Sequence, residues 1–280
     1  MIGLLERLMG RKPRTAAPEL RPDFHAVGYP KTGNTWTRIM FGRYVRSVYD
    51  LVEMPLFDPV EMAEMRAAGY AGPLGEFTHH PLTWKTQRAR DLSAENVVAP
   101  FRGRRVVFLT RHPLDTLVSA FMQARFKVAA SPYPGDLADF IADPVYGLEK
   151  LIRFHEIWAE HHGETADFLL WRYEDVRTDP AGQMRRLLAF LGIPLDETAL
   201  ADAVDFASFD NLKAVETSGT RLVYKSSGFN AFGDGPRDDP NAFLVRKGRI
   251  KGYKDELDAA CVARLEDTIR STMPKMFVPE

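Results

Sequence analysis

Residues Phe24–Val48 read FHAVGYPKTGNTWTRIMFGRYVRSV, and two structural patterns follow each other in this stretch. A short apolar run ends at Gly28, and a helical pattern begins near Gly33. At the start of a helix, backbone N–H groups without intrahelical partners and the helix dipole together favour an anion. Lys31 adds a full positive charge just before that point. The segment therefore predicts a strand, a phosphate-binding loop and a helix.

Three more polar side chains stand in this loop, at Thr32, Asn34 and Thr35, and each can donate a hydrogen bond to a phosphate. The loop differs from a Walker A loop, in which the lysine follows the second glycine and precedes Ser or Thr. Here Lys31 comes before Gly33. An ordinary strand-to-helix turn with a solvated lysine is the alternative that these residues alone leave open.

The length and net charge of the chain limit its number of domains and the kinds of ligand that we expect. The chain has 280 residues, of which 45% are hydrophobic, enough for one large α/β domain or two small ones. Because no Pro/Ser-rich linker divides it, we expect a single domain over residues 23–280 after an N-terminal extension, residues 1–22. Lys and Arg total 37 against 38 Asp and Glu, and the net charge of −1 gives no reason to expect nucleic-acid binding. Any anion site must be local.

The cysteine count and the N-terminus bear on localisation. A single cysteine, Cys261, permits no internal disulfide and fits a reducing compartment. The N-terminal MIGLLERLMGRKPR is interrupted by Glu6 and Arg7, so it lacks the continuous apolar run of a signal peptide or a transmembrane helix. It is either a frayed start or a short amphipathic helix in weak contact with a membrane surface. We expect a cytoplasmic protein.

A second strand, turn and helix follow at Arg104–Arg111, RRVVFLTR, whose apolar run exits into a helical pattern opened by Pro113. Further helices are predicted over residues 58–69, 147–163, 180–192 and 256–273, and a strand over 167–173. This alternation predicts an α/β fold with a mainly parallel sheet covered by helices, and ligands of such sheets bind beyond the carboxyl ends of the strands. The glycine-rich stretch 217–240 predicts a lid.

Three motifs carry a family resemblance. YPKTGNTW resembles the 5′-phosphosulfate loop, usually YPKSGTTW, of the soluble sulfotransferases, enzymes that use 3′-phosphoadenosine 5′-phosphosulfate (PAPS). RHPLDTLVSAF resembles the 3′-phosphate motif of that family, in which an arginine and a serine eight residues later, here Arg111 and Ser119, hold the 3′-phosphate. A guanidinium suits phosphate because its donors form a planar, permanently charged fork. RKGRIKGY, residues Arg246–Tyr253, is similar to the family's RKGxxGxW element.

The resemblance spans residues 24–253 and implies the P-loop-like three-layer fold of this family. It implies nucleotide contacts from residues of the three motifs and from two aromatic positions beside adenine, Tyr173 and Phe209. The implied PAPS-binding residues are Lys31, Thr32, Gly33, Asn34, Thr35, Trp36, Arg111, Ser119, Tyr173, Phe209, Arg246, Lys247 and Gly248.

The catalytic candidates lie in GEFTHHPL. Transfer of a sulfuryl group to a hydroxyl or amine needs a base for the acceptor's proton, and histidine suits this task near neutral pH. The family pattern places a histidine after Lys-Thr, which selects His79 over His80, although Phe77 replaces the lysine. Glu76 is the alternative base, as in some carbohydrate sulfotransferases. The resemblance assigns Lys31 to the leaving phosphate.

The resemblance thus implies a PAPS-dependent sulfotransferase that needs no metal ion, acts on a small-molecule, lipid or carbohydrate acceptor and releases 3′-phosphoadenosine 5′-phosphate (PAP). One rival is a P-loop kinase or phosphotransferase, which needs an acidic Mg²⁺ ligand at the end of a neighbouring strand. The strand predicted within residues 104–111 ends instead in Thr110 and Arg111. A second rival is a nucleotide-binding protein without catalysis. The sequence leaves the acceptor and the oligomeric state open.

Overall fold

The computed structural model describes residues 21–51, 62–79, 86–126, 132–220 and 240–278. Within them, four parallel strands form one sheet in the order β2-β1-β3-β4. The strands are β1 (Phe24–Gly28), β2 (Gly75–Thr78), β3 (Arg105–Thr110) and β4 (Asp167–Arg172). The α-helices are α1 (Asn34–Val48), α2 (Met62–Ala67), α3 (Ala94–Val97), α4 (Pro113–Phe126), α5 (Leu137–Ala142), α6 (Leu148–His161), α7 (Tyr173–Thr178), α8 (Pro180–Leu191), α9 (Glu197–Phe206), α10 (Phe209–Thr217) and α11 (Ala259–Thr272).

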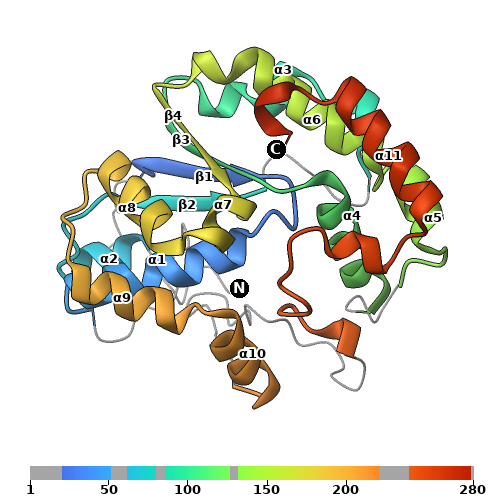
Figure 1. The fold of residues 1–280 in the computed structure, drawn as a ribbon. Coiled ribbons are helices and arrows are strands. Elements are labelled where there is room, and N and C mark those ends of the chain that lie inside the picture. The colour runs from blue at the N-terminus through green and yellow to red at the C-terminus, as the bar shows by residue number, and fades with distance from the viewer. Residues whose placement is uncertain (1–20, 52–61, 80–85, 127–131, 221–239, 279–280) are drawn as a thin grey trace, which may run out of the picture.

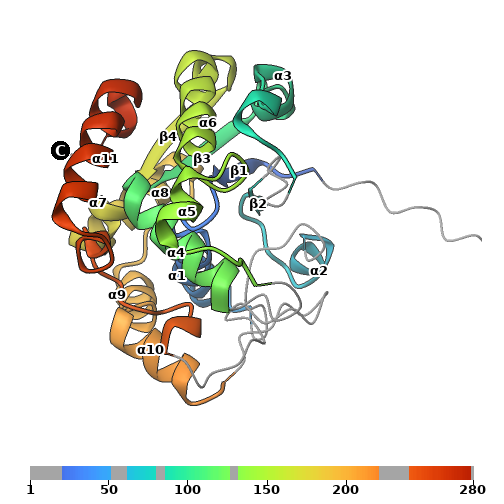
Figure 2. The ribbon, with the colours of Figure 1, turned by 90° about the vertical axis from the view of Figure 1, so that its right-hand side faces the viewer.

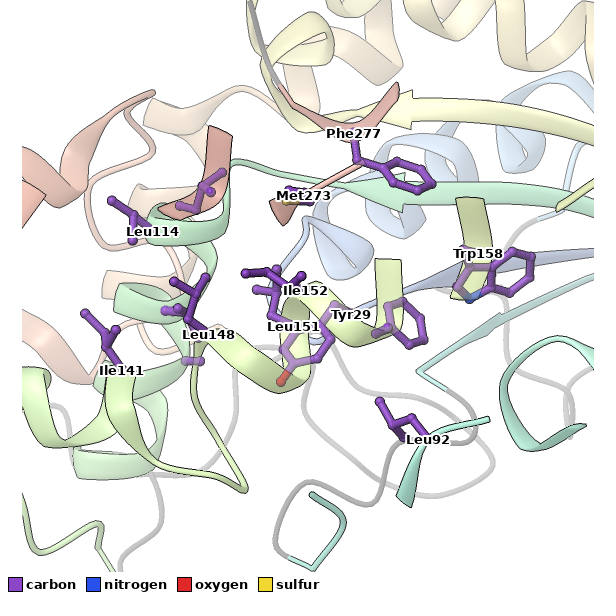
Figure 3. Packing of buried hydrophobic residues seen from close by; sticks show 14 of the residues in the cluster. Tyr29, Leu92, Leu114, Ile141, Leu148, Leu151, Ile152, Trp158, Met273 and Phe277 are labelled. Carbon is purple, nitrogen blue, oxygen red and sulfur yellow. The ribbon is translucent and has the colours of Figure 1, made fainter. Parts of the chain in front are cut away.

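The sheet is buried on both faces, as parallel sheets are. On one face, Val106 and Phe108 of β3 join a core with α4, α6 and α11, and on the other, Val107 and Leu109 join a core with α1, α8 and α9. In the first core, the ring centre of Phe108 lies 5.0 Å from those of Trp158 and Phe277. Figure 3 shows Trp158 and Phe277 among the buried residues of this core. Helices thus cover both faces (Figures 1 and 2), and the predicted three-layer α/β fold is confirmed.

Most predicted elements appear near their expected bounds because their capping residues act as expected. Helix α8 begins after Asp179, which accepts a hydrogen bond from the Gly182 N–H, and ends at Gly192, whose φ of 69° closes it. The last helix begins at Ala259, three residues later than predicted, because Asp258 caps it and residues 252–255 form a separate 3₁₀ turn. Helices α9 and α10 are absent from the sequence prediction.

Several predictions fall wholly or partly outside the described residues. Of the helix predicted over 58–69, the structure describes α2, Met62–Ala67. Residues 1–20 of the predicted N-terminal extension and residues 221–239 of the predicted lid lie outside the described residues. The first residue of that lid, Thr217, is the last residue of α10.

The pairing of β1 with both β2 and β3 builds the rim where the two motif loops meet. Gly28 pairs with Leu109, so the loop after β1 and the turn after β3 leave the sheet side by side. Helices α1 and α4 then start from this same rim. The phosphate loop, Arg111 and the end of β2 are therefore neighbours in space.

Gly75→Ala in β2 tests this packing. A Cβ at residue 75 would lie 2.1 Å from the ring of Phe24, which is buried against Phe41 and Phe77 and has no room to move. We expect the free energy of unfolding, measured with urea, to fall by about 1–3 kcal/mol. Gly163→Ala is the control, because no atom lies within 4 Å of its added Cβ. Equal stability of both variants would contradict the packing described.

Candidate active site

The loop after β1 is held in an unusual backbone conformation. Lys31 has φ 78° and Gly33 has φ 99°, both in the left-handed region that side chains other than glycine rarely adopt. Thr32 stabilises the turn between them, since its hydroxyl donates to the Tyr29 carbonyl at 2.7 Å. Non-glycine residues in such conformations cost about 1–3 kcal/mol and cluster at functional sites. Helix α1 then begins at Asn34 without a side-chain cap at its first N–H groups.

One cavity of about 510 Å³ brings the three motifs together. Its walls come from the loop after β1, the end of β2, α4, α7, α10 and residues 244–252. Every site residue predicted from the sequence lines it except Thr32. These residues are Lys31, Gly33, Asn34, Thr35, Trp36, His79, Arg111, Ser119, Tyr173, Phe209, Arg246, Lys247 and Gly248.

Thr32 differs from the expectation that its side chain donates to a phosphate. It is 1% exposed, and both its hydroxyl and its backbone N–H point to the Tyr29 carbonyl. Its role in this structure is to shape the loop. The polar side chains of the loop that line the cavity are those of Lys31, Asn34 and Thr35.

The cavity is strongly cationic. Among the described residues, its lining holds a single carboxylate, that of Asp115. The cationic lining residues are Lys31, Arg38, Arg111, Arg177, Arg246, Lys247 and Arg249. Arg38, Arg177 and Arg249 are not among the site residues predicted from the sequence. Such an excess of positive charge, in a protein of net charge −1, matches a ligand with several negative charges.

Among the buried donors in the lining, Nε of Arg111 and Nδ2 of Asn34 have no hydrogen-bond partner within the described residues. Buried polar groups are nearly always satisfied, so a ligand oxygen is the natural partner for both. Arg111 is already held in place from two sides. Its Nη1 donates to the Lys31 carbonyl at 3.4 Å, and its guanidinium lies 4.3 Å from the centre of the Tyr173 ring.

Aromatic rings form the end of the cavity nearest α7 and α10. Trp36 and Tyr173 meet edge to face with ring centres 5.4 Å apart, and the Trp36 indole donates to the Ala207 carbonyl at 2.7 Å. The guanidinium of Arg177 lies 5.8 Å from the Trp36 ring and 6.0 Å from the Phe209 ring. A flat heterocycle that stacks on rings and cations fits this end.

His79 stands just beyond the end of β2, half-buried at the cavity wall. Its Nδ1 lies 2.9 Å from the Gly28 carbonyl, which can only accept, so Nδ1 carries the hydrogen and Nε2 is left as the acceptor. Burial lowers the pKa of His79 to about 4, and the charges of Lys31 and Arg38 act in the same direction. The imidazole is therefore neutral at pH 7.

The alternative bases are placed differently. Glu76 does not line the cavity, and its carboxylate lies 2.9 Å from Nδ1 of His25. This position removes the argument for a glutamate base. His80 lies outside the described residues.

Lys31 reaches across the cavity to α4. Its Nζ donates to Oε1 of Gln123 at 2.8 Å, and both residues line the cavity. Gln123 is one helical turn beyond Ser119 and escapes prediction because nothing in the local pattern marks a glutamine on a helix. The hydrogen bond fixes the ammonium group between the phosphate loop and α4.

The RKGRIKGY segment brings three further cations to the cavity, Arg246, Lys247 and Arg249. Arg246 Nη1 lies 2.6 Å from Oε1 of Glu256, and Lys247 Nζ lies 2.8 Å from the same atom. Gly248 packs on Phe209, where a Cβ would approach the ring to 2.2 Å. Tyr253, where the family has tryptophan, is fully buried and stacks on His112 with ring centres 4.6 Å apart.

No group of three or more His, Cys, Asp or Glu residues within the described residues could hold a metal ion. No described helix is long and apolar enough to cross a membrane.

Known proteins resemble this chain in sequence and in fold. Sulfotransferase 1C2 of Oryctolagus cuniculus is 23% identical over 271 residues, which cover 91% of this chain and 84% of that protein. Cytosolic sulfotransferase 17 of Arabidopsis thaliana is 24% identical over 266 residues, which cover 87% of this chain and 72% of that protein. The crystal structure of mouse sulfotransferase SULT7A1 complexed with PAP has the same fold, with a TM-score of 0.61 at 20% identity over 92% of this chain and 86% of that one.

The model of the sulfotransferase domain family matches residues 21–277, nearly the whole chain. The match includes all three motifs, the end of β2 and the aromatic positions on α7 and α10. This chain therefore belongs to the sulfotransferase domain family.

Proposed function

We propose that the protein transfers the sulfuryl group of PAPS to a hydroxyl or amine of an acceptor and releases PAP. The observation that carries this proposal is the convergence of Lys31, residues 33–36, Arg111, Ser119 and residues 246–248 on one cationic cavity beside His79. The mouse relative complexed with PAP supports the choice of nucleotide. Membership of the sulfotransferase domain family supports the choice of reaction.

In this proposal, the nucleotide lies along the cavity with its two phosphate ends at different motifs. The first N–H groups of α1, with Lys31 and Thr35, hold the 5′-phosphosulfate. Arg111, Ser119 and the cations of residues 246–247 hold the 3′-phosphate, and the rings around Trp36 hold adenine. This orientation directs the sulfuryl group toward the wall that carries His79. Protein cations, rather than a metal ion, balance the phosphate charges.

The transfer is an in-line displacement at sulfur. Nε2 of His79 takes the acceptor's proton while the acceptor oxygen or nitrogen bonds to sulfur. The bond from sulfur to the bridging oxygen breaks, and that oxygen leaves as part of the 5′-phosphate of PAP. Lys31 stabilises the negative charge that develops on it. Positioning and electrostatic stabilisation supply the rate, as they do in phosphoryl transfer.

The acceptor is a small molecule, a lipid or a carbohydrate. We propose that the reaction takes place in the cytoplasm, as the name of the Arabidopsis relative indicates for that protein.

Incubation with sulfur-labelled PAPS and a metabolite extract tests the function. We expect label in a product that is heavier than its precursor by one SO₃ group. ATP turnover that needs Mg²⁺, without sulfate transfer, would favour a kinase. Tight PAP binding without any transfer would favour a non-catalytic protein.

His79→Asn tests the base. Asparagine can keep the hydrogen bond to Gly28 but cannot take a proton, so turnover should fall by about 10²- to 10⁴-fold. PAP affinity, measured by calorimetry, should remain within about threefold of the wild-type value because Nε2 makes no phosphate contact in our proposal. His25→Asn, which alters a buried histidine outside the cavity lining, is the control and should retain activity. Normal turnover of His79→Asn would contradict the assignment.

The low pKa of His79 gives a second test, in the ligand-free protein. A histidine whose folded pKa lies near 4 stays neutral between pH 5 and pH 6.5, where an ordinary histidine gains a proton. Protonation then favours the unfolded chain, so His79 lowers stability as the pH falls from 6.5 toward 4. In NMR titrations, the His79 ring resonance, assigned from its loss in His79→Asn, should shift with a midpoint near 4. A midpoint near 6.5 would contradict the burial described.

A further inference from the structure

Residues 244–253, which we name the strap, carry the predicted 3′-phosphate cations to the cavity. The strap has no helix or strand until the 3₁₀ turn at Gly252–Asp255, and it lies between α10 and α4 before the chain enters α11 (Figure 1). Residues 244–249 all line the cavity. A segment without regular backbone hydrogen bonds needs other contacts to fix its position. Two buried carboxylates provide them.

Glu216 holds the first end of the strap. This residue lies in the last turn of α10 and is 2% exposed. Its Oε1 accepts a hydrogen bond from the Leu244 N–H at 2.7 Å, and its Oε2 accepts one from the Val245 N–H at 2.8 Å. The next two residues along the chain are the cavity cations Arg246 and Lys247. The anchor thus acts directly before the cations.

Asp115 holds the other end. It lies in the first turn of α4, one turn before Ser119, and is 3% exposed. Its Oδ2 accepts a hydrogen bond from the Lys251 N–H at 2.8 Å, and its Oδ1 accepts one from the Tyr253 N–H at 3.0 Å. Both oxygens of each carboxylate therefore bond to the backbone of the strap. Hydrogen bonds to an ionised acceptor are the strong class.

The position of Asp115 calls for an explanation of its own. Asp115 is the single carboxylate in the described lining of the cavity, and it lies one helical turn from Ser119, which we propose to hold the 3′-phosphate. Its negative charge would repel that phosphate. Two N–H donors of the strap offset this charge and bring the strap against α4. Between the anchors, Gly248 packs on Phe209 with φ 58°, which fixes the middle of the strap. The three contacts leave the cations facing the cavity.

We propose that Asp115 and Glu216 are positioning residues that hold the strap so that Arg246, Lys247 and Gly248 form the 3′-phosphate subsite. Their carboxylate oxygens bond to the backbone of the strap, and in this proposal they make no bond to the nucleotide. The inference rests on the proposed function, because it assumes that the cavity takes a nucleotide with a 3′-phosphate. It follows that these carboxylates set the preference for PAP over adenosine 5′-phosphate, which lacks that group. The loop at α1, which binds the 5′-phosphate, is separate from the strap.

Calorimetric dissociation constants of PAP and adenosine 5′-phosphate for wild type, Asp115→Asn and Glu216→Gln test this inference. Each substitution keeps the side-chain shape but turns one acceptor oxygen into an NH₂ group that faces an N–H donor. We expect PAP affinity to fall about 10- to 100-fold in each variant, the loss typical of broken charge-assisted hydrogen bonds. Affinity for adenosine 5′-phosphate should change by less than about threefold. Asp115→Glu, which restores the charge, should recover part of the preference.

Asp143→Asn is the matched control. Its Oδ1 also accepts two backbone N–H groups, from Val145 at 2.7 Å and Tyr146 at 3.1 Å, but Asp143 does not line the cavity. This variant should keep the wild-type ratio of the two affinities. If Asp115→Asn and Glu216→Gln lose affinity equally for both nucleotides, or lose none, the inference is overturned. If Asp115→Asn does not fold, the result for Glu216→Gln decides. A wild-type protein that does not prefer PAP would instead overturn the proposed function.

Discussion

The parallel pairing of β1 with β3 is the constraint on which the site depends. It places Gly28 beside Leu109, so closely that a Cβ at residue 28 would lie 2.6 Å from the Leu109 carbonyl oxygen and 2.7 Å from Oγ1 of Thr32. The loops that follow the two strands therefore begin side by side. One loop enters α1 and the other leads through Arg111 to α4. The pairing of β1 with β2 adds His79, whose ring bonds to the carbonyl of the same Gly28.

The charged side chains at this rim form two sets, one cationic and one anionic. The first set consists of lysines and arginines that line the cavity, and their positive charge suits an anionic ligand. The second set consists of carboxylates, in the lining or behind it, that bond to the cations or to the backbone around them. Glu256 pairs with Arg246 and Lys247, while Asp115 and Glu216 bond to the strap. The cationic cavity is thus compatible with an ordinary, nearly neutral protein.

Local patterns predict much of this structure. The apolar runs of β1, β3 and β4 and the Pro and Gly residues around α8 mark those elements in the sequence. Strand β2 is harder to predict because its four residues, GEFT, have no apolar run, and it exists because β1 offers a free edge. Helices α9 and α10 escape prediction although Asp196 and Ser208 cap them, because the apolar stripe of each is short.

Some residues of the site can likewise be predicted from local sequence patterns, and others cannot. Motif residues could be placed from sequence because each motif is a continuous stretch. Gln123, Arg38 and Arg177 could not. Their positions beside Lys31, beside Phe77, and beside the rings of Trp36 and Phe209 depend on packing between distant elements. Thr32 shows the reverse case. Its place in the motif suggests a ligand contact, yet its hydroxyl satisfies the Tyr29 carbonyl and shapes the turn.

The most direct test of the account is a crystal structure of the protein with PAP. The account predicts the 5′-phosphate at the first N–H groups of α1, with the 3′-phosphate within hydrogen-bond distance of Arg111 and Ser119. Nε of Arg111 and Nδ2 of Asn34, which have no partner within the described residues, should then bond to ligand oxygens. PAP bound in the reverse orientation, or outside this cavity, would contradict the central claim that the cavity is a two-phosphate nucleotide site.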